Sequence, residues 1–158
     1  MICIKRLLVQ TRAALMVAAT ALLAALSAAH AQDGPQPRLA TVELRAGMHL
    51  IRAELAVTAE QQATGMMFRT TMGANEGMLF VNDDAGVRCF WMRNTLIPLT
   101  IAFLDDDGTI VNLADMQPRS DRSHCSARPV RYALEMNQGW FAKRGIQPGF
   151  RIRGGPFR

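Results

Sequence analysis

Short apolar segments separated by turn-forming residues are the feature that most restricts how this sequence can fold. Hydrophobic and polar residues alternate along 51–57 and 130–136, whereas 99–104 is apolar on both faces. A period of two is typical of a strand with one buried face, and a short apolar run is typical of a strand buried on both. We therefore predict seven or eight short strands, at residues 41–45, 51–57, 78–81, 87–92, 99–104, 110–116, 130–136 and 150–153.

Turn residues predict that neighbouring strands are joined as hairpins. Asp107-Gly108 lies between two apolar segments, which is a strong short-range hairpin signal. Ala46-Gly47 has the same place between the first two strands, and residues 82–86 are expected to form a third hairpin connection. The sheet should therefore be mostly antiparallel.

Two short helices are expected between these strands. Thr58 and Gln61 have the spacing of a capping box, and the apolar residues that follow predict a helix that ends near Phe68. A second helix is expected at 140–144, stopped by Gly145. The predicted fold class is α+β, mostly antiparallel β: a curled sheet or partial barrel of seven to eight short strands with two short helices.

The N-terminus has the pattern of a secretory signal. Residues 1–13 carry three basic residues and no acid, 14–29 is an apolar run rich in alanine, and Ala29-His30-Ala31 resembles a cleavage site. We predict cleavage after Ala31, which leaves no stable membrane span and a periplasmic or secreted protein. The alternative is an uncleaved anchor, and both place the folded part outside the cytoplasm.

The remaining chain is predicted to form one domain. Residues 32–38 contain two prolines and a glycine and are expected to be a flexible lead-in. The domain should cover 39–153, followed by a frayed tail at 154–158. After cleavage, 15 basic and 13 acidic residues remain, so the pI near 9.9 of the whole chain arises largely from the signal. We therefore expect no nucleic-acid partner.

Charge is distributed unevenly along the predicted domain. Residues 32–118 carry 6 arginines and 11 acids, whereas 119–158 carry 9 basic residues and 2 acids. An Arg-rich face could dock to an anionic envelope surface. The interpretation that we favour is that the two halves neutralise each other across neighbouring strands.

The mature chain keeps two cysteines, Cys89 and Cys125, since Cys3 lies in the signal. An even pair in an oxidising compartment is a disulfide candidate, and two separately buried thiols are the alternative. Cys125 next to His124 also gives the rival hypothesis of an envelope-acting cysteine enzyme. A thiolate nucleophile needs a base or a positive field, and Arg122 or Arg128 could supply the field. We favour a structural or disulfide cysteine, and predict no catalytic residue.

Two metal hypotheses are weaker than their structural alternatives. Asp105 to Asp107 precede a glycine, but an EF-hand loop in that register would begin at Phe103 and end at Ala114, neither of which is a carboxylate. Soft thioethers with histidine could hold Cu(I), although core packing explains the methionines better; the residues concerned are Met66, Met67, Met72, Met78 and Met92 with His49 or His124. We predict no metal and no cofactor.

The densest group of unusual polar residues lies around 90–98. Arginine, asparagine and threonine there supply several hydrogen-bond donors and acceptors, and a tryptophan could floor a polar pocket. The alternative is structural: the polar residues satisfy a tight turn, and Arg93 pairs with Glu76 or Asp105. If a ligand site exists, we expect it among Arg69, Glu76, Trp91, Arg93, Asn94 and Thr95.

Several motifs in order resemble one protein family. They are GMMFR at 65–69, EGMLFV at 76–81, FWMRNTLIPL at 90–99, IAFLD at 101–105, YALEMNQGW at 132–140 and GIQPG at 145–149. The sequence is similar to the domain-of-unknown-function 192 family of mostly exported bacterial and archaeal proteins, which commonly have lysine at the position of Arg93. The resemblance implies a small β-rich α+β domain, and it implies no particular activity.

These observations together favour an exported, non-enzymatic domain. It would be an accessory or ligand-binding module whose partner is an unknown small molecule or an envelope protein. The absence of a recognisable catalytic dyad, metal-ligand spacing or cofactor loop in the sequence is the reason for this preference.

Overall fold

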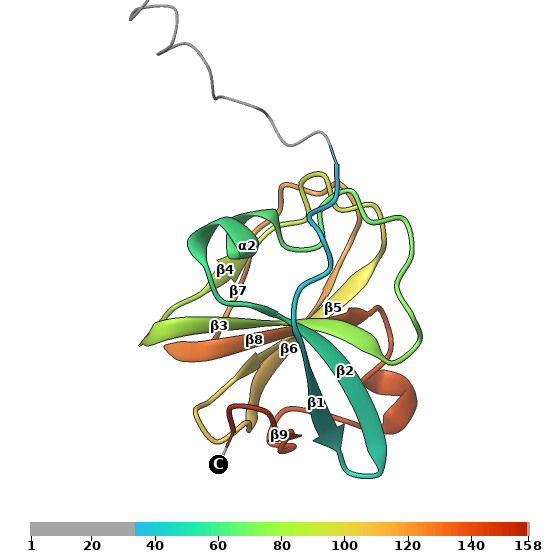
Figure 1. Cartoon of the computed structure of the whole chain (residues 1–158). Helices are drawn as coiled ribbons and strands as arrows, with labels where there is room; N and C mark the ends of the chain where they lie inside the picture. Colours follow the sequence, from blue (N-terminus) through green and yellow to red (C-terminus); the bar gives the residue numbers. More distant parts are fainter. Residues whose placement is uncertain (1–33, 158) are drawn as a thin grey trace, which may run out of the picture. The chain divides into compact units, whose positions relative to one another are not determined.

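The computed structural model describes residues 34–157, so the expected signal at 1–31 lies outside the described part of the chain. The protein is rich in β-structure, as the sequence predicts (Figure 1). In chain order its elements are β1 (Thr41–Ala46), β2 (His49–Ala56), α2 (Ala59–Thr64), β3 (Glu76–Gly86), β4 (Cys89–Phe90), β5 (Leu99–Leu104), β6 (Ile110–Met116), β7 (His124–Cys125), β8 (Val130–Asn137), the 3₁₀ turn η1 (Ala142–Arg144) and β9 (Arg153–Gly154).

Seven strands form one curled sheet in the order β6-β5-β8-β3-β2-β1-β9 (Figure 1). Neighbouring strands are antiparallel, except β2 and β3, which run parallel. A parallel pair needs a long crossover connection, and α2 with the loop after it provides one. The remaining strands, β4 and β7, form a separate two-stranded ribbon. The mostly antiparallel curled sheet is confirmed, but the sequence did not predict the parallel pair.

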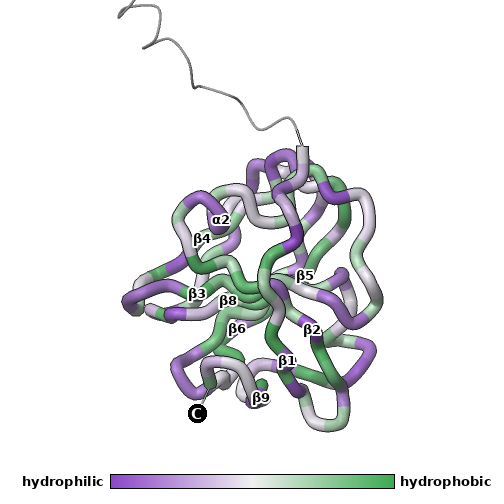
Figure 2. Tube along the Cα trace, in the orientation of Figure 1, coloured by the Kyte–Doolittle hydropathy of each residue, from purple (hydrophilic) through white to green (hydrophobic). Residues whose placement is uncertain are grey.

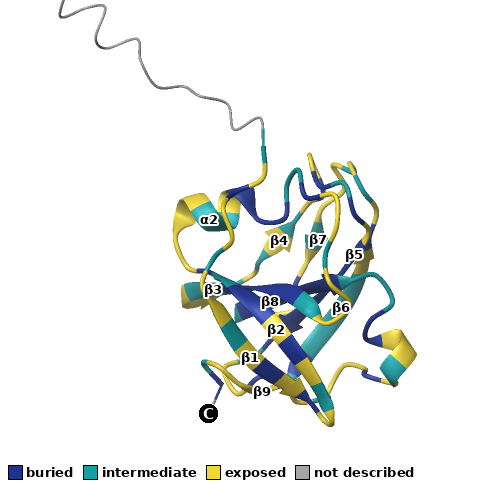
Figure 3. Ribbon diagram, turned by 45° about the vertical axis from the view of Figure 1, so that its right-hand side comes forward, coloured by how far each residue is buried: buried dark blue, intermediate teal, exposed yellow. Residues whose placement is uncertain are grey.

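Both faces of the central strands are buried. Leu134 and Met136 of β8 belong to one hydrophobic core, and Ala133 of the same strand belongs to a second core on the opposite face. Side chains alternate along a strand, so this division follows directly from the strand period. Apolar residues follow the central strands in Figure 2, and β8 is largely buried in Figure 3.

The helix α2 begins as predicted but ends early. The Thr58 hydroxyl accepts a hydrogen bond from the Gln61 amide N–H at 3.2 Å, and the Gln61 side-chain oxygen accepts one from the Thr58 amide at 3.1 Å. This capping box confirms the predicted start. The predicted end near Phe68 is wrong, because the helix stops at Thr64 and Gly65 takes a positive φ of 49°.

The second predicted helix is also wrong. Residues 142–144 form a single 3₁₀ turn, after which Gly145 adopts the left-handed conformation with φ of 66°. The glycine stop signal is therefore confirmed. A segment this short cannot nucleate an α-helix by itself, and packing of Trp140 and Phe141 into the core fixes it instead. Among the described residues, none lies in a helix long and apolar enough to cross a bilayer.

The hairpin expected at 82–86 does not form. Strand β3 continues through these residues to Gly86, which pairs with Val130 after an irregularity in the register. The Asn82 amide donates to the backbone oxygen of Arg131 at 2.9 Å, which ties this polar part of β3 to β8. The turn-like composition therefore marks the exposed end of a long strand. Strand β4 pairs with β7, which the sequence did not predict.

The C-terminal residues pack onto the domain. Gly154 pairs with Leu44 of β1, and the ring of Phe157 lies edge-on to Tyr132 with 5.0 Å between ring centroids. Phe157 is only 8% exposed. Of the predicted tail, residues 154–157 are therefore ordered parts of the fold, since they supply a strand pair and an apolar side chain to the core.

Candidate ligand-binding pocket

One row of side chains crosses the sheet and contains two buried carboxyl groups. Glu54 pairs with Met78, and Met78 pairs with Glu135, which is itself opposite Ile101. Directly paired residues project from the same face, so the two glutamates lie on one side of the sheet. Adjacent strands are about 4.8 Å apart, which places their backbones roughly 10 Å from each other.

Glu54 has a full set of partners. Its two carboxylate oxygens accept hydrogen bonds of 2.6 and 2.8 Å from the Arg69 guanidinium, and further bonds come from Arg38 at 2.7 Å and the Leu39 amide at 2.9 Å. Burial alone would raise its pKa, but these hydrogen bonds outweigh burial and lower the pKa to about 2. Glu54 is therefore a structural anion at neutral pH.

Glu135 has the opposite surroundings. Its residue is 4% exposed, and within residues 34–157 its carboxyl group has no hydrogen-bond or ion-pair partner. Burial raises the pKa of Glu135 to about 8. Buried carboxyl groups are normally paired, so one that opens into a cavity without a partner marks a place where a ligand or water would bind.

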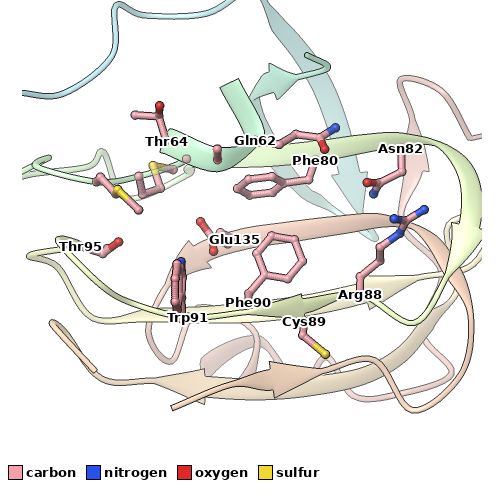
Figure 4. A pocket seen from close by; sticks show the side chains of 14 residues that line it. Gln62, Thr64, Phe80, Asn82, Arg88, Cys89, Phe90, Trp91, Thr95 and Glu135 are labelled. Carbon is pink, nitrogen blue, oxygen red and sulfur yellow. The ribbon is translucent and has the colours of Figure 1, made fainter. Parts of the chain in front are cut away.

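The cavity next to Glu135 has a volume of about 340 Å³. It lies between the sheet, the helix α2 with the loop that follows it, and β4. In Figure 4 the rings of Phe80, Phe90 and Trp91 surround the Glu135 carboxyl group. Its lining consists of Gln62, Ala63, Thr64, Gly65, Met66, Met67, Phe80, Asn82, Arg88, Cys89, Phe90, Trp91, Thr95 and Glu135. A mostly apolar pocket with few polar groups is the usual form of a small-molecule site.

Close strand contacts and a tight turn hold these groups in place. A Cβ atom at Gly77 would lie 2.6 Å from the backbone oxygen of Glu135, so β3 can approach β8 closely only with glycine there. The turn that carries Thr95 closes with a hydrogen bond of 3.0 Å from the Thr95 amide to the Met92 carbonyl. Asn94 in that turn has a positive φ of 59°, which asparagine tolerates.

Thr95 supplies the second polar group without a partner. The residue is 5% exposed and lines the pocket, and its hydroxyl has no hydrogen bond in the described part of the chain. Its backbone, by contrast, is fully used, because the carbonyl accepts from the Arg119 amide at 3.0 Å. Thr95 is therefore fixed in position with an available hydroxyl.

The structure divides the six residues expected at a site among three places. Trp91 and Thr95 line the pocket. Arg69 forms the buried pair with Glu54, and Glu76 accepts hydrogen bonds from Arg38 at 3.4 Å and from the Gly73 amide at 3.1 Å. These two residues belong to the neighbouring ion-pair cluster.

Arg93 and Asn94 have largely structural contacts. The Arg93 guanidinium carbon lies 4.2 Å from the centroid of the Trp91 ring, and its Nε donates to Asp121 at 2.8 Å. The expected pairing of Arg93 with Glu76 or Asp105 is wrong, since Asp121 is the partner. Asn94 accepts from the Phe68 amide through its backbone oxygen at 2.8 Å, which ties the turn to the loop after α2.

Cys89 and Cys125 form a disulfide, as the sequence suggested. The two residues face each other across the β4–β7 ribbon, and Cys89 lines the pocket. The Cys125 sulfur is therefore not available as a thiolate in this structure. Burial and the nearby charge of Arg122 lower the pKa of His124, which favours the neutral imidazole.

The other candidate ligand groups are engaged elsewhere. Asp105 pairs with Arg128 of the loop between β7 and β8, and Asp107 accepts from the Thr109 amide at 2.9 Å within the β5–β6 turn. Met78 and Met92 are fully buried in the second core. Within residues 34–157, no group of three or more His, Cys, Asp or Glu side chains could hold a metal ion.

Sequence reasoning missed Glu135, the main feature of the pocket. Alternation along 130–136 places Glu135 on the face opposite Leu134, which an isolated strand would expose to solvent. The one available signal was Ala133, an apolar residue on that same face. Burial of this face depends on α2 and β4, which are distant in sequence and therefore invisible to a strand pattern.

Fold and site together define a small β-rich domain with an apolar pocket around a buried carboxyl group. The chain belongs to the DUF192 family, described as an uncharacterized ACR, whose model matches residues 41–154. It is similar to the crystal structure of a protein from Sinorhizobium meliloti 1021, provisionally named a transcription regulator, with 34% identity, a TM-score of 0.74, and coverage of 77% of this chain and 99% of that chain.

A second solved structure supports the same fold. It is a protein of unknown function from Novosphingobium aromaticivorans DSM 12444, with 38% identity, a TM-score of 0.67, and coverage of 80% of this chain and 91% of that chain. No curated protein matches the sequence. The family is therefore established and its role is unknown.

Proposed function

We propose that this protein is an exported ligand-binding domain, and that the 340 Å³ pocket around Glu135 is its binding site. The observation that carries the proposal is the pair of polar groups, Glu135 and Thr95, that are buried and lack partners in the described chain. Both side chains line the pocket, so a ligand that enters it can supply the hydrogen bonds that they lack.

Two other depressions of the surface support the proposal by contrast. A hollow of about 420 Å³ next to η1 contains Thr100 and Asp115, but these two side chains hydrogen-bond to each other at 2.5 Å. Another, next to the β5–β6 turn, contains Asp105 and Asp107, whose carboxylates are engaged with Arg128 and Thr109. Neither contains a buried polar side chain without a partner in the described chain, as the Glu135 pocket does.

Binding fits the lining residues better than catalysis. Within residues 34–157, Glu135 is the one carboxyl group that lines the pocket, and the neighbouring Cys89 sulfur is held in a disulfide. General acid–base or nucleophilic chemistry needs a second reactive group within hydrogen-bond reach. The lining provides a recognition group and apolar walls.

A DNA-binding role has less support. The Sinorhizobium meliloti protein is provisionally named a transcription regulator. Reading a major groove usually takes a helix or a two-stranded ribbon with basic residues toward the bases. In the described chain α2 has six residues, its first turn contains Glu60, and its last turn has no basic residue. The strands of the β4–β7 ribbon contain no lysine or arginine.

Export is supported by two features. The segment at 1–31 has the pattern of a cleavable signal, and disulfides such as Cys89–Cys125 persist mainly in oxidising compartments. We expect osmotic shock of a bacterial host to release a chain that begins at Gln32, as measured by intact mass. Recovery from the cytoplasm of a chain that begins at Met1 would contradict export.

The binding site is tested by a fragment screen on the disulfide-bonded mature domain, read by amide chemical shifts in NMR. We expect several fragments to shift residues of the pocket, and the variant Met67→Trp, which fills the cavity, to lose those shifts while keeping a folded spectrum. Shifts that fall elsewhere, or a screen with no binder, would contradict the proposed site.

A further inference from the structure

The polar groups of the pocket are suited to a ligand that donates hydrogen bonds. An ionised Glu135 carboxylate can only accept, and the Thr95 hydroxyl can accept as well. Both residues are at least nine-tenths buried and lack partners within residues 34–157. A ligand with several N–H donors on one atom can donate to both groups, whereas an anionic ligand would be repelled by the ionised form of Glu135.

The walls of the pocket are suited to a positive charge. Phe80 and Phe90 pack edge to face with 4.8 Å between ring centroids, and Trp91 lies beside Glu135 (Figure 4). The faces of aromatic rings attract cations, most strongly for tryptophan. Trp91 already binds one cation, since the Arg93 guanidinium carbon is 4.2 Å from its ring centroid.

The cation that lines the pocket has an ion-pair partner. One terminal nitrogen of Arg88 donates to the Asp84 carboxylate at 2.6 Å and to the Asp84 carbonyl at 2.7 Å, while its buried Nε has no hydrogen-bond partner in the described chain. Figure 4 places Arg88 beside Asn82, at the opposite end from Thr95. Arg88 therefore leaves the region around Glu135 open to a positive ligand group.

We propose that the pocket binds a small organic ammonium ion, such as a primary amine on a compact apolar body. The ammonium N–H groups donate to the Glu135 carboxylate and the Thr95 hydroxyl, and the apolar body packs against Phe80, Phe90 and Trp91. This inference rests on the proposed function, because it names the ligand class of the same site.

Binding of an ammonium ion should be coupled to release of a proton. Burial raises the pKa of Glu135 to about 8, which favours the protonated form at neutral pH, whereas the ion pair needs the carboxylate. Affinity should therefore rise with pH, up to about tenfold per unit below pH 8.

The charged and titratable groups around Glu135 do not change this expectation. Glu54 on β2 keeps its charge between pH 6.5 and 8, and the neutral form of His124 on β7 is favoured over that range. The cationic group in the pocket lining is Arg88, which pairs with Asp84. The residues of β5 and of the segment 62–67 that pack here carry no titratable side chain.

The test uses three probes with the same apolar body: n-hexylamine, 1-hexanol and hexanoate. The alkylammonium group, like that of lysine, stays charged to about pH 10. Affinities are measured by amide shifts of the mature domain at pH 6.5 and 8. We expect n-hexylamine to bind at least tenfold tighter than 1-hexanol at pH 8, hexanoate to bind weakest, and the amine to lose at least tenfold at pH 6.5.

Two variants separate recognition from folding. Glu135→Gln keeps the shape of the protonated side chain, so we expect it to fold and to bind the amine no better than the alcohol. Glu60→Gln makes the same chemical change at an exposed position of α2 outside the lining, and should leave all affinities unchanged.

The outcomes distinguish this inference from the proposed function. If 1-hexanol binds the pocket as tightly as n-hexylamine, if Glu135→Gln keeps the preference, or if the amine does not bind while other fragments do, the ammonium class is wrong and the binding site stands. If no fragment shifts the pocket residues, both are wrong.

Discussion

The two buried glutamates of this sheet show how surroundings decide the role of a side chain. Glu54 and Glu135 lie in one row on the same face, separated by a single strand. Four hydrogen bonds lower the pKa of Glu54 to about 2, against burial, whereas burial alone raises the pKa of Glu135 to about 8. One carboxyl group therefore pairs with donors of the fold, and the other has no partner in the described chain.

The difference comes from the segments that cover each glutamate. Glu54 is met by the loop that carries Arg69 and by the N-terminal residues Arg38 and Leu39, all of which bring hydrogen-bond donors. Glu135 is met by aromatic and thioether side chains from β3, the loop after α2, and β4. The Arg69 guanidinium therefore pairs with the Glu54 carboxylate, whereas the Glu135 carboxyl group faces a cavity.

Removal of Arg69 should have the largest effect. Arg69→Ala leaves Glu54 buried with a reduced set of donors, and breaking a buried pair costs about 3–5 kcal/mol of unfolding free energy. Urea unfolding of the variant and the wild-type protein measures this loss of unfolding free energy. The matched control is Arg38→Ala, whose side chain is 61% exposed and should cost less than about 1 kcal/mol. Equal losses for the two variants would contradict the assignment of Glu54 to a buried structural pair.

Loss of the disulfide should have the second largest effect on stability. The disulfide holds β4, which forms one wall of the pocket at Glu135. The bridge closes a segment of 36 residues, so the chain-entropy model gives about 3–4 kcal/mol for its removal. We expect the double variant Cys89→Ser, Cys125→Ser to lose that amount in urea unfolding, and to bind pocket fragments more weakly because β4 supplies one wall. Reduction of the wild-type protein should reproduce the result. An unchanged midpoint would show that the ribbon is held by other contacts.

The pH dependence of stability should have opposite signs for the two glutamates. The folded pKa of Glu135 is raised, so the folded state binds more protons than the unfolded state between about pH 4.5 and 8, and stability falls as pH rises through that window. The slope is at most about 1.4 kcal/mol per pH unit. Glu54, with its lowered pKa, contributes stability above about pH 4.5 that is lost as pH falls through 2.

Unfolding curves at several pH values check this prediction. Relative to Glu135→Gln, the wild-type protein should lose stability from pH 5 to pH 8, and the difference should be smallest at pH 5. A constant difference between the two proteins over this range would mean that Glu135 titrates normally.

The smallest expected effect is that of Thr95→Val. Its hydroxyl has no partner in the described chain, so removal should change stability by less than about 0.5 kcal/mol. Thr100→Val is the contrast, because the Thr100 hydroxyl donates to Asp115 at 2.5 Å and accepts from the Gly139 amide at 3.1 Å. We expect it to cost about 1–3 kcal/mol. A large loss for Thr95→Val would place its hydroxyl in the structural network.

Local signals in the sequence predicted local structure well. The capping box at Thr58 and Gln61 and the turn at Asp107-Gly108 are confirmed, because each depends on residues only a few positions apart. The polar residues at 82–86 led to a wrong prediction of a hairpin. Their local composition suits both a turn and the solvated end of a strand, and it does not distinguish the two.

The site could be predicted only in part, because it is made by contacts between distant segments. Trp91 and Thr95 line the pocket, whereas Arg69 pairs with Glu54 across 15 positions of sequence. Glu135 was missed because its burial depends on which segments cover the second face of β8. The segments that cover it are the apolar crossover after β2 and the ribbon held by Cys89 and Cys125. The pattern of apolar residues along β8 does not show which distant segments pack on that face.

The most direct test is a ¹³C NMR titration of the glutamate side-chain carboxyl carbons in the disulfide-bonded mature domain without ligand. The account predicts that Glu135 titrates with a midpoint near pH 8 and that Glu54 stays ionised down to about pH 2. The Glu135→Gln variant assigns the upper signal. A Glu135 midpoint near 4.5, the ordinary value for glutamate, would contradict the claim that this carboxyl group is buried without a partner.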